Sequence, residues 1–260
     1  MGRSGSSARL PSSDPSVLGD FPVVELRRYT AQPGARERFA RIFETHFPGA
    51  FEQLGAVIAA TGFERDHHDG FTWVRGFHTY DARAIVNSAF YFGPVWQQHK
   101  RAINDLLVAF DDVLLLRALP GRPGVSVLPA VDPVTEAAGA RGLVVAHIFA
   151  VRPDALEAFA RLAEPVFAEY GRTGARAGGV LATLDAPNNF PLHPVRNDGP
   201  HFVWLGVLQD DAMLQTAFRP VAERAVVSLT ASGLVRGTPE LVVLDPTPRS
   251  RLRWLPKEEE

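Results

Sequence analysis

Hydrophobic and polar positions alternate along several short stretches of the chain, and each stretch predicts a β-strand. The clearest alternation places four residues on one strand face: Phe71, Trp73, Arg75 and Phe77. This face mixes aromatic rings with a cation, and the small residue Gly76 lies on the other face. We therefore expect a cavity or a close neighbour beside this strand.

Apolar residues that recur every three or four positions predict helices between the strands. One helix opens after Pro33-Gly34, and a second helical region, 81–110, is interrupted near Gly93-Pro94. In the second half, helices are expected after Pro153 and over about 210–232. The expected strands lie at 23–29, 56–64, 70–79, 113–119, 143–151, 176–184, 201–208 and 240–245.

The two halves of the chain echo each other in sequence. Phe-Thr-Trp ends at Trp73 and Phe-Val-Trp at Trp204, while Phe-Gly-Pro-Val begins at Phe92 and Phe-Arg-Pro-Val at Phe218. We therefore expect two tandem ferredoxin-like βαββαβ units. The expected boundaries are a flexible tail at 1–20, unit one at 21–119, a linker at 120–140, unit two at 141–247 and a C-terminal tail at 248–260.

Each such unit has a four-stranded antiparallel sheet with helices on one face, which leaves the other face bare. Two bare faces can cover each other by closing into a barrel within one chain. The expected fold class is therefore α+β, with two ferredoxin-like sheets packed into a barrel.

Composition narrows the function classes. The chain has 27 Lys and Arg against 29 Asp and Glu, and its net charge of −2 does not favour nucleic acid or anionic membranes. It has no cysteine, which excludes disulfides, thiolate nucleophiles and thiolate metal sites. No apolar run suits a membrane span or a signal peptide, so we expect a cytoplasmic protein. Met1, Gly2 and Ser6 fit the minimal myristoylation pattern, and the early Arg and Ser residues also fit a transit peptide.

Four short motifs are more specific than this composition. They are Val-Glu-Leu-Arg-x-Tyr at 24–29, Phe-x-Trp-Val-Arg-Gly-Phe at 71–77, Phe-Tyr-x-Gly-Pro-Val-Trp-x-x-His at 90–99 and Asn-Phe-Pro-Leu-His-Pro-Val-Arg at 189–196. Together they resemble the NIPSNAP family of the dimeric α/β-barrel superfamily, over about residues 22–247. The resemblance implies that fold. Its implication for activity is broad, because relatives include cofactor-free monooxygenases, isomerase-like and degradative enzymes, haem proteins and members without an established activity.

Charged and aromatic residues share the faces of two expected strands. Glu25, Arg27 and Tyr29 alternate on the first strand, as Trp73 and Arg75 do on another. If these faces line the barrel, they give it a ligand-binding interior. The alternative is a buried ion pair of Glu25 with one of the arginines that only fixes strand register.

Equivalent positions in the second half are less polar. By offset, Arg27 becomes His147 and Arg75 becomes Gly206, while Trp96 and His99 both become alanine. A structural requirement of the fold would act alike on both halves. We therefore expect one site, built mainly from the first half, to which the second half contributes His147.

Two further features carry chemistry. His99, one turn after Trp96, can be a general base, a haem ligand or a solvent-facing residue. The loop at 185–200, which contains Arg196, either covers the barrel mouth or caps a sheet edge or a dimer contact. No phosphate loop, serine elbow or zinc-protease motif is present, so hydrolase and nucleotide-cofactor functions have no motif behind them and no cofactor is expected. The adjacent His67 and His68 would point in opposite directions on an extended segment, so no metal site is expected there.

The sequence thus predicts a protein that binds a small, partly aromatic, oxygenated molecule. Cofactor-independent proton transfer, isomerisation, cyclisation or oxygenation is the expected chemistry, if the protein is an enzyme. The alternatives are a non-catalytic interaction protein and a haem-binding barrel, and homo-oligomers are compatible with all three. The expected catalytic residues are Arg75, His99, Tyr29 and His147, and the expected ligand-binding residues are Glu25, Arg27, Trp73, Phe77, Tyr91, Trp96 and Arg196.

Overall fold

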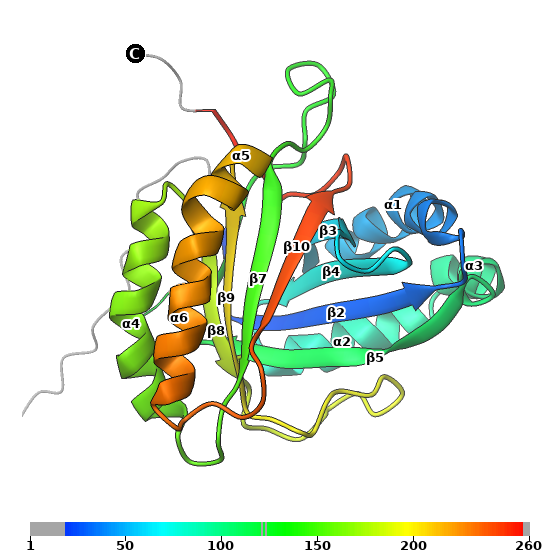
Figure 1. The fold of residues 1–260 in the computed structure, drawn as a ribbon. Helices are drawn as coiled ribbons and strands as arrows, with labels where there is room; N and C mark the ends of the chain where they lie inside the picture. Colours follow the sequence, from blue (N-terminus) through cyan, green and yellow to red (C-terminus); the bar gives the residue numbers. More distant parts are fainter. Residues whose placement is uncertain (1–18, 121, 123, 257–260) are drawn as a thin grey trace, which may run out of the picture.

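The computed structural model describes residues 19–120, 122 and 124–256 (Figure 1). The expected flexible tail, up to residue 18, and residues 257–260 lie outside this part of the chain. The first half contains strands β1 (Gly19–Phe21), β2 (Val23–Ala31), β3 (Ala56–Glu64), β4 (Gly70–Phe77) and β5 (Leu107–Ala118). Its helices are α1 (Arg36–Gln53), α2 (Tyr80–Tyr91) and α3 (Pro94–Asn104).

The second half follows a similar order. After β6 (Val125–Val127), its strands are β7 (Leu143–Ala150), β8 (Arg176–Thr183), β9 (His201–Leu208) and β10 (Glu240–Pro246). Helix α4 (Leu156–Arg172) lies between β7 and β8. A short α5 (Asp211–Met213), a π-helical turn (Leu214–Phe218) and α6 (Arg219–Ala231) lie between β9 and β10.

Eight strands close into one antiparallel barrel in the order β10-β3-β4-β2-β5-β8-β9-β7. Strands from the two halves meet at two seams, where β5 pairs with β8 and β10 pairs with β3. The predicted α+β fold, with sheets that cover each other inside one chain, is confirmed. Closure pairs the strand edges that an open sheet would expose.

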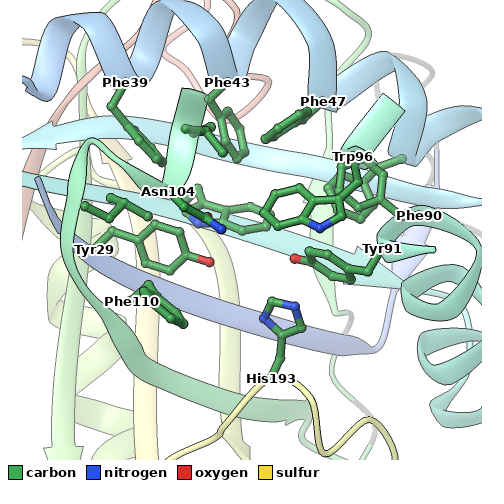
Figure 2. Close-up of a pocket in the computed structure, with 14 residues that line it drawn as sticks. Tyr29, Phe39, Phe43, Phe47, Phe90, Tyr91, Trp96, Asn104, Phe110 and His193 are labelled. Atoms are coloured by element: carbon green, nitrogen blue, oxygen red, sulfur yellow. The ribbon is translucent and has the colours of Figure 1, made fainter. Parts of the chain in front are cut away.

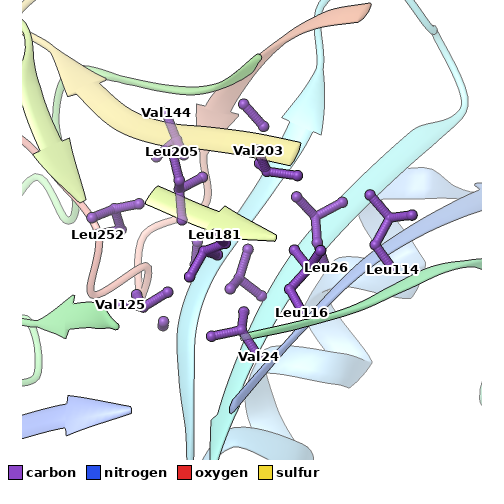
Figure 3. Packing of buried hydrophobic residues seen from close by; sticks show 14 of the residues in the cluster. Val24, Leu26, Leu114, Leu116, Val125, Val144, Leu181, Val203, Leu205 and Leu252 are labelled. Atoms are coloured by element: carbon purple, nitrogen blue, oxygen red, sulfur yellow. The ribbon is translucent and has the colours of Figure 1, made fainter. Parts of the chain in front are cut away.

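The barrel interior is filled by aliphatic side chains from both halves (Figure 3). Val24 and Leu26 from β2 and Val74 from β4 meet Leu181 and Val203 from the second half. This corrects the expectation that Glu25, Arg27 and Arg75 line the barrel. Period two holds, but the charged face turns toward the helices. An eight-stranded barrel is just wide enough to be filled by its own side chains, and small branched ones fit it.

Helices cover the outer face of each sheet, α1, α2 and α3 in the first half and α4 and α6 in the second (Figure 1). Helix α1 buries a stripe of aromatic residues spaced by four: Phe39, Phe43, Phe47 and Phe51. The predicted break between α2 and α3 occurs at Gly93, where a Cβ would clash with the carbonyl oxygen of Ala89. Among the described residues, no helix is both long and apolar enough to cross a bilayer.

Two segments expected to be a linker and a tail contribute side chains to the barrel cluster. Strand β6 pairs with β1, and its Val125 and Val127 are buried in the barrel cluster. After β10, the backbone N–H of Leu252 donates to the carbonyl of Ala59, and the Leu252 side chain joins the same cluster. The described part of the expected C-terminal tail, up to residue 256, therefore helps to close the barrel.

Replacing Leu252 should show how much this closure contributes. Leu252 is 5% exposed, so Leu252→Ala should lower the free energy of unfolding by about 2–4 kcal/mol through lost burial and a residual cavity. The control Leu192→Ala, at a position 65% exposed, should change it by less than about 0.5 kcal/mol. Urea unfolding measures both. Equal small losses would mean that residues 248–256 do not support the barrel.

Candidate functional site

A cavity of about 210 Å³ lies between the first-half sheet and helices α1, α2 and α3 (Figure 2). Its walls are mainly aromatic, with a few polar groups. The lining residues are Tyr29, Phe39, Phe43, Phe47, Phe51, Trp73, Phe90, Tyr91, Trp96, Ile103, Asn104, Leu107, Phe110 and His193. Such a chamber suits a flat apolar body that carries one or a few polar atoms.

Local structure explains how these rings converge. The α1 stripe packs in one cluster with Tyr29 and Trp73, which lie on neighbouring strands that pair at Arg27↔Trp73 and Tyr29↔Phe71. Tyr91 is the last residue of α2 and Trp96 lies in the first turn of α3, and their rings meet edge to face with centroids 5.0 Å apart. The break at Gly93 thus brings two aromatic residues to one wall.

One carboxylate and three guanidiniums lie beneath this aromatic layer. Glu25 accepts from Arg27 Nη1 at 2.8 Å, from Arg83 Nε at 2.6 Å and from Arg75 Nη2. None of the four side chains is exposed to solvent. Burial alone would raise the pKa of Glu25, but the ion pairs with the three arginines outweigh it and hold the pKa well below its usual range. Glu25 is therefore a fixed anion and not a proton acceptor.

This cluster carries two positive charges more than negative ones. Within the described part of the chain, Nε and Nη1 of Arg75, Nη2 of Arg83 and Nε1 of Trp73 have no hydrogen-bond partner. The Arg75 guanidinium lies 4.6 Å from the ring centroid of Phe51 and 5.0 Å from that of Trp73, which offsets part of the cost of burial. Both rings line the cavity, so the excess charge lies directly behind its wall.

Two phenols and one imidazole supply the central polar groups of the cavity. Figure 2 shows the hydroxyls of Tyr29 and Tyr91 facing each other, with His193 beside them. The Tyr29 oxygen accepts from Arg27 Nε at 2.9 Å, which leaves its own proton free to be donated. Burial raises the pKa of Tyr29 although Arg27 opposes this, so the phenol is neutral at pH 7.

His193 reaches the cavity from the 185–200 loop of the second half. Its ring centroid lies 3.9 Å from that of Tyr91, and its Nδ1 lies 3.3 Å from Arg27 Nη2. Burial, with Arg27 and Arg75 adding to it, lowers the pKa of His193 to about 3. The imidazole is therefore neutral at pH 7.

The same loop is anchored to the charged cluster. Arg83 Nη1 donates to the side-chain oxygens of Asn188 at 3.0 Å and Asn189 at 2.5 Å. Asn189 in turn donates to the carbonyl of Tyr80 at 2.7 Å. Phe190 is buried beside Tyr91, with parallel rings 5.7 Å apart. These contacts anchor the loop beside the cavity, and His193 is the loop residue that lines it.

Some of the residues predicted for the site line the cavity, and others lie outside it. Tyr29, Trp73, Tyr91 and Trp96 line the cavity, while Glu25, Arg27 and Arg75 lie beneath its wall. Phe77 is buried on the same sheet face, with its ring 5.1 Å from the Arg75 guanidinium, but does not line the cavity.

Three predicted residues lie elsewhere. His99 stacks on His46 of α1, with ring centroids 3.7 Å apart. His147 is buried in the other sheet–helix layer, where its Nδ1 lies 2.8 Å from the hydroxyl of Tyr170. Arg196 bonds Asp198 at 2.7 Å and Asp112 at 3.3 Å. None of the three lines the cavity, and His147 lies beside Tyr170 of the second half, apart from the first-half residues with which it was expected to form one site.

Two important residues were absent from the predicted site. Arg83 lies on the buried stripe of α2 with Val86, Asn87 and Phe90, so a charge at an apolar helical position was the available signal. His193 had only its place in a long loop to mark it. Among the described residues, no group of three or more His, Asp or Glu side chains could hold a metal ion.

Comparison with known proteins supports the fold. No family model and no curated protein sequence matches the chain. Among solved structures, an anthrone oxidase-like protein is similar with a TM-score of 0.57 and 12% identity, over 89% of this chain and 93% of the other. A proposed monooxygenase from Lactobacillus acidophilus has a TM-score of 0.54 and 12% identity, over 87% and 94%. Both likenesses concern the fold alone.

A third similarity covers less of the chain. A NIPSNAP-like domain protein from Burkholderia xenovorans covers 43% of this chain and 94% of its own, with 20% identity and a TM-score of 0.37. That likeness is too low to carry an argument. The described residues thus have an α+β fold with a closed eight-stranded antiparallel barrel, and the two similarities that cover most of the chain support this fold.

Removing one charge at a time should show whether Glu25 or Arg75 is required for the stability of the Glu25–arginine cluster. Glu25→Gln leaves three buried guanidiniums without a counter-charge and should lower the free energy of unfolding by about 3–5 kcal/mol. Arg75→Met leaves two guanidiniums on Glu25 and removes one that has two nitrogens without a partner in the described part of the chain, so the unfolding free energy should change by no more than about 1 kcal/mol. Urea unfolding compares them. If Arg75→Met cost as much as Glu25→Gln, Arg75 would be a required structural partner.

His147 should make stability depend on pH. Burial lowers its pKa to about 3 in the folded protein, against about 6.5 in the unfolded chain. Its contribution is fully present above the unfolded pKa and is lost as pH falls, because only the unfolded chain takes up the proton. Between about pH 6 and 4 the loss is about 1.4 kcal/mol per pH unit. As pH falls, the unfolding free energy of His147→Gln should therefore decrease less steeply than that of the wild type, by this amount per pH unit. Parallel slopes of unfolding free energy against pH in the two proteins would contradict the prediction.

Proposed function

We propose that the cavity binds a small, partly aromatic, oxygenated molecule and stabilises negative charge on its oxygen. The observation that carries this proposal is the group of three arginines around one carboxylate, which leaves two excess positive charges behind an aromatic wall. Buried cations without counter-charges are costly for a fold. An anionic ligand atom nearby offsets that cost.

Cavity size limits the ligand. An apolar protein cavity of about 150 Å³ accommodates benzene. At about 210 Å³, this cavity has room for one substituted ring or a fused pair of rings. Tyr29, Tyr91 and His193 lie near its middle, so the ligand's oxygen is proposed to meet them while its ring lies among the α1 phenylalanines.

The proposed chemistry is stabilisation of a phenolate or an enolate. Tyr29 is a neutral donor whose oxygen already accepts from Arg27, which strengthens its donation to an oxyanion. Proton transfer, isomerisation, cyclisation and cofactor-free oxygenation all pass through such charge. The names of the two solved structures with similar folds, a proposed monooxygenase and an anthrone oxidase-like protein, agree with this class.

The alternatives have less support. Haem binding was proposed with His99 as the iron ligand, and His99 stacks on His46 and not on the cavity wall. A non-catalytic interaction protein has no use for an aromatic cavity beside excess charge, and the binding experiment below distinguishes it.

We also propose that residues 21–119 and 141–247 are two tandem ferredoxin-like units joined by a linker at 120–140, and that the protein is a NIPSNAP relative. The strand orders β3-β4-β2-β5 and β8-β9-β7-β10 support this, since each is the same arrangement of four successive strands. Association of further copies and a cytoplasmic location stay predictions.

Binding of 4-nitrophenol tests the proposed function. Calorimetry should detect one site in the wild-type protein. Tyr29→Phe removes only the hydroxyl and should weaken binding about tenfold or more, as expected for a hydrogen bond to a charged group. The matched control Tyr170→Phe removes a buried hydroxyl from the other sheet–helix layer and should leave affinity unchanged. No binding at millimolar concentration, or equal losses in both variants, would overturn the proposal.

A further inference from the structure

We propose that Arg27 is a positioning residue that holds His193 as its Nε2–H tautomer, so that His193 donates a hydrogen bond to the ligand's oxygen and does not take its proton. This inference rests on the proposed function of the cavity. It assigns to Arg27 and His193 roles that charge stabilisation alone does not specify.

The first step is the contact between the two side chains. Arg27 Nη2 lies 3.3 Å from His193 Nδ1. A guanidinium has only donors, so Nδ1 must accept. A neutral imidazole that accepts at Nδ1 carries its proton at Nε2. The nitrogen left for a ligand is therefore a donor.

The second step is that the ring cannot easily turn to present another atom. It packs against Tyr91, at 3.9 Å between centroids, and stacks with Phe190 at 5.6 Å. The carbonyl of His193 accepts from Asn188 Nδ2 at 2.7 Å, and Asn188 is itself held by Arg83. One arginine thus fixes the ring and a second fixes the backbone behind it.

The third step is that Arg27 orients two donors at once. Its Nη1 donates to Glu25, its Nε to the Tyr29 oxygen and its Nη2 to His193. Both neighbours accept from the same planar cation, so each directs its remaining proton elsewhere. The Arg27 cation thereby polarises a neutral phenol and a neutral imidazole, which makes both of them stronger hydrogen-bond donors toward the cavity.

The consequence concerns the ligand's proton. No carboxylate lines the cavity within the described residues, and Glu25 is occupied by three guanidiniums. An acidic phenol or enol must then lose its proton to solvent: the O–H bond breaks, the electron pair stays on the ligand's oxygen and the proton goes to buffer. The cavity should therefore select ligands that ionise near neutral pH.

The tautomer can be measured without any ligand. Nitrogen-15 NMR of labelled protein at pH 7 should show His193 protonated at Nε2, with His193→Gln assigning the signal. Arg27→Met should remove this preference. Arg75→Met takes an equal charge from the same carboxylate without touching His193 and should preserve it. Protonation at Nδ1 in the wild type, or the same change in both variants, would overturn the proposal.

Proton release gives the second measurement. Calorimetry with 4-nitrophenol, below the pKa of the free phenol and in two buffers of different ionisation enthalpy, should show one proton released per ligand bound. Apparent affinity should rise about tenfold per pH unit in this range, since only the anion binds. Binding without proton release would mean that the bound ligand keeps its proton or gives it to the protein, which would overturn the proposed release to solvent but not the ligand site. Absence of binding would instead refute the proposed function, and the NMR result would still decide the tautomer.

Discussion

The buried carboxylate of Glu25 is the constraint on which the first half of the molecule depends. It lies opposite Arg75 in the β2–β4 pairing and also bonds Arg27 on its own strand and Arg83 on α2. Each charge alone would be costly to bury, so the strands and the helix meet where the ions are paired. A slip of β2 by one residue would turn Glu25 and Arg27 into the aliphatic barrel interior and leave Arg75 and Arg83 without their carboxylate. Strand register is therefore set by charge as well as by packing.

The second half shows that the fold does not need such a cluster. Gly206 lies two residues after Trp204, as Arg75 lies two residues after Trp73, and a Cβ at Gly206 would clash with the Trp204 indole. An aromatic ring thus takes the room that the first half gives to a guanidinium. His147 pairs with a neutral tyrosine there. Because neutral packing is sufficient in one half, we propose that the two excess positive charges of the other half, which strand register does not require, serve a ligand.

Sequence periodicity was enough to predict most of the architecture and part of the site. The strands, the break at Gly93-Pro94 and the closure of the barrel follow from local patterns and from the need to cover a bare sheet face. Period two also grouped Glu25, Arg27 and Tyr29 correctly. It could not say which face turns inward, because that depends on what covers each side. The aliphatic face fills the barrel, and the larger aromatic face needs the space under the helices.

Contacts between distant segments were beyond any local pattern. His193 meets Arg27 across 166 residues of sequence, through a loop whose docking depends on Arg83. His99 is the reverse case, because it was predicted for the site but does not line the cavity. It lies one turn after Trp96, and its ring stacks on His46 of the neighbouring helix α1. A motif gives residue types and spacing, whereas a site also requires that the segment carrying it be anchored. Here the loop that carries His193 is anchored by Arg83 of the Glu25 cluster, for which the sequence suggested only an ion pair of Glu25 with one arginine.

The position of the arginines beneath the cavity wall has a physical advantage for the proposed function. Trp73 and Tyr29 separate the guanidiniums from the ligand space, so the cations stay dry and their field is weakly screened. Among the residues that the structure describes, two nitrogens of Arg75 have no hydrogen-bond partner, which costs stability in the free protein. An anionic ligand would supply the missing charge while meeting only neutral donors, which need not move to receive it. The excess positive charge that destabilises the free protein would then be compensated by the bound anion. A ligand that fits should therefore also raise the free energy of unfolding.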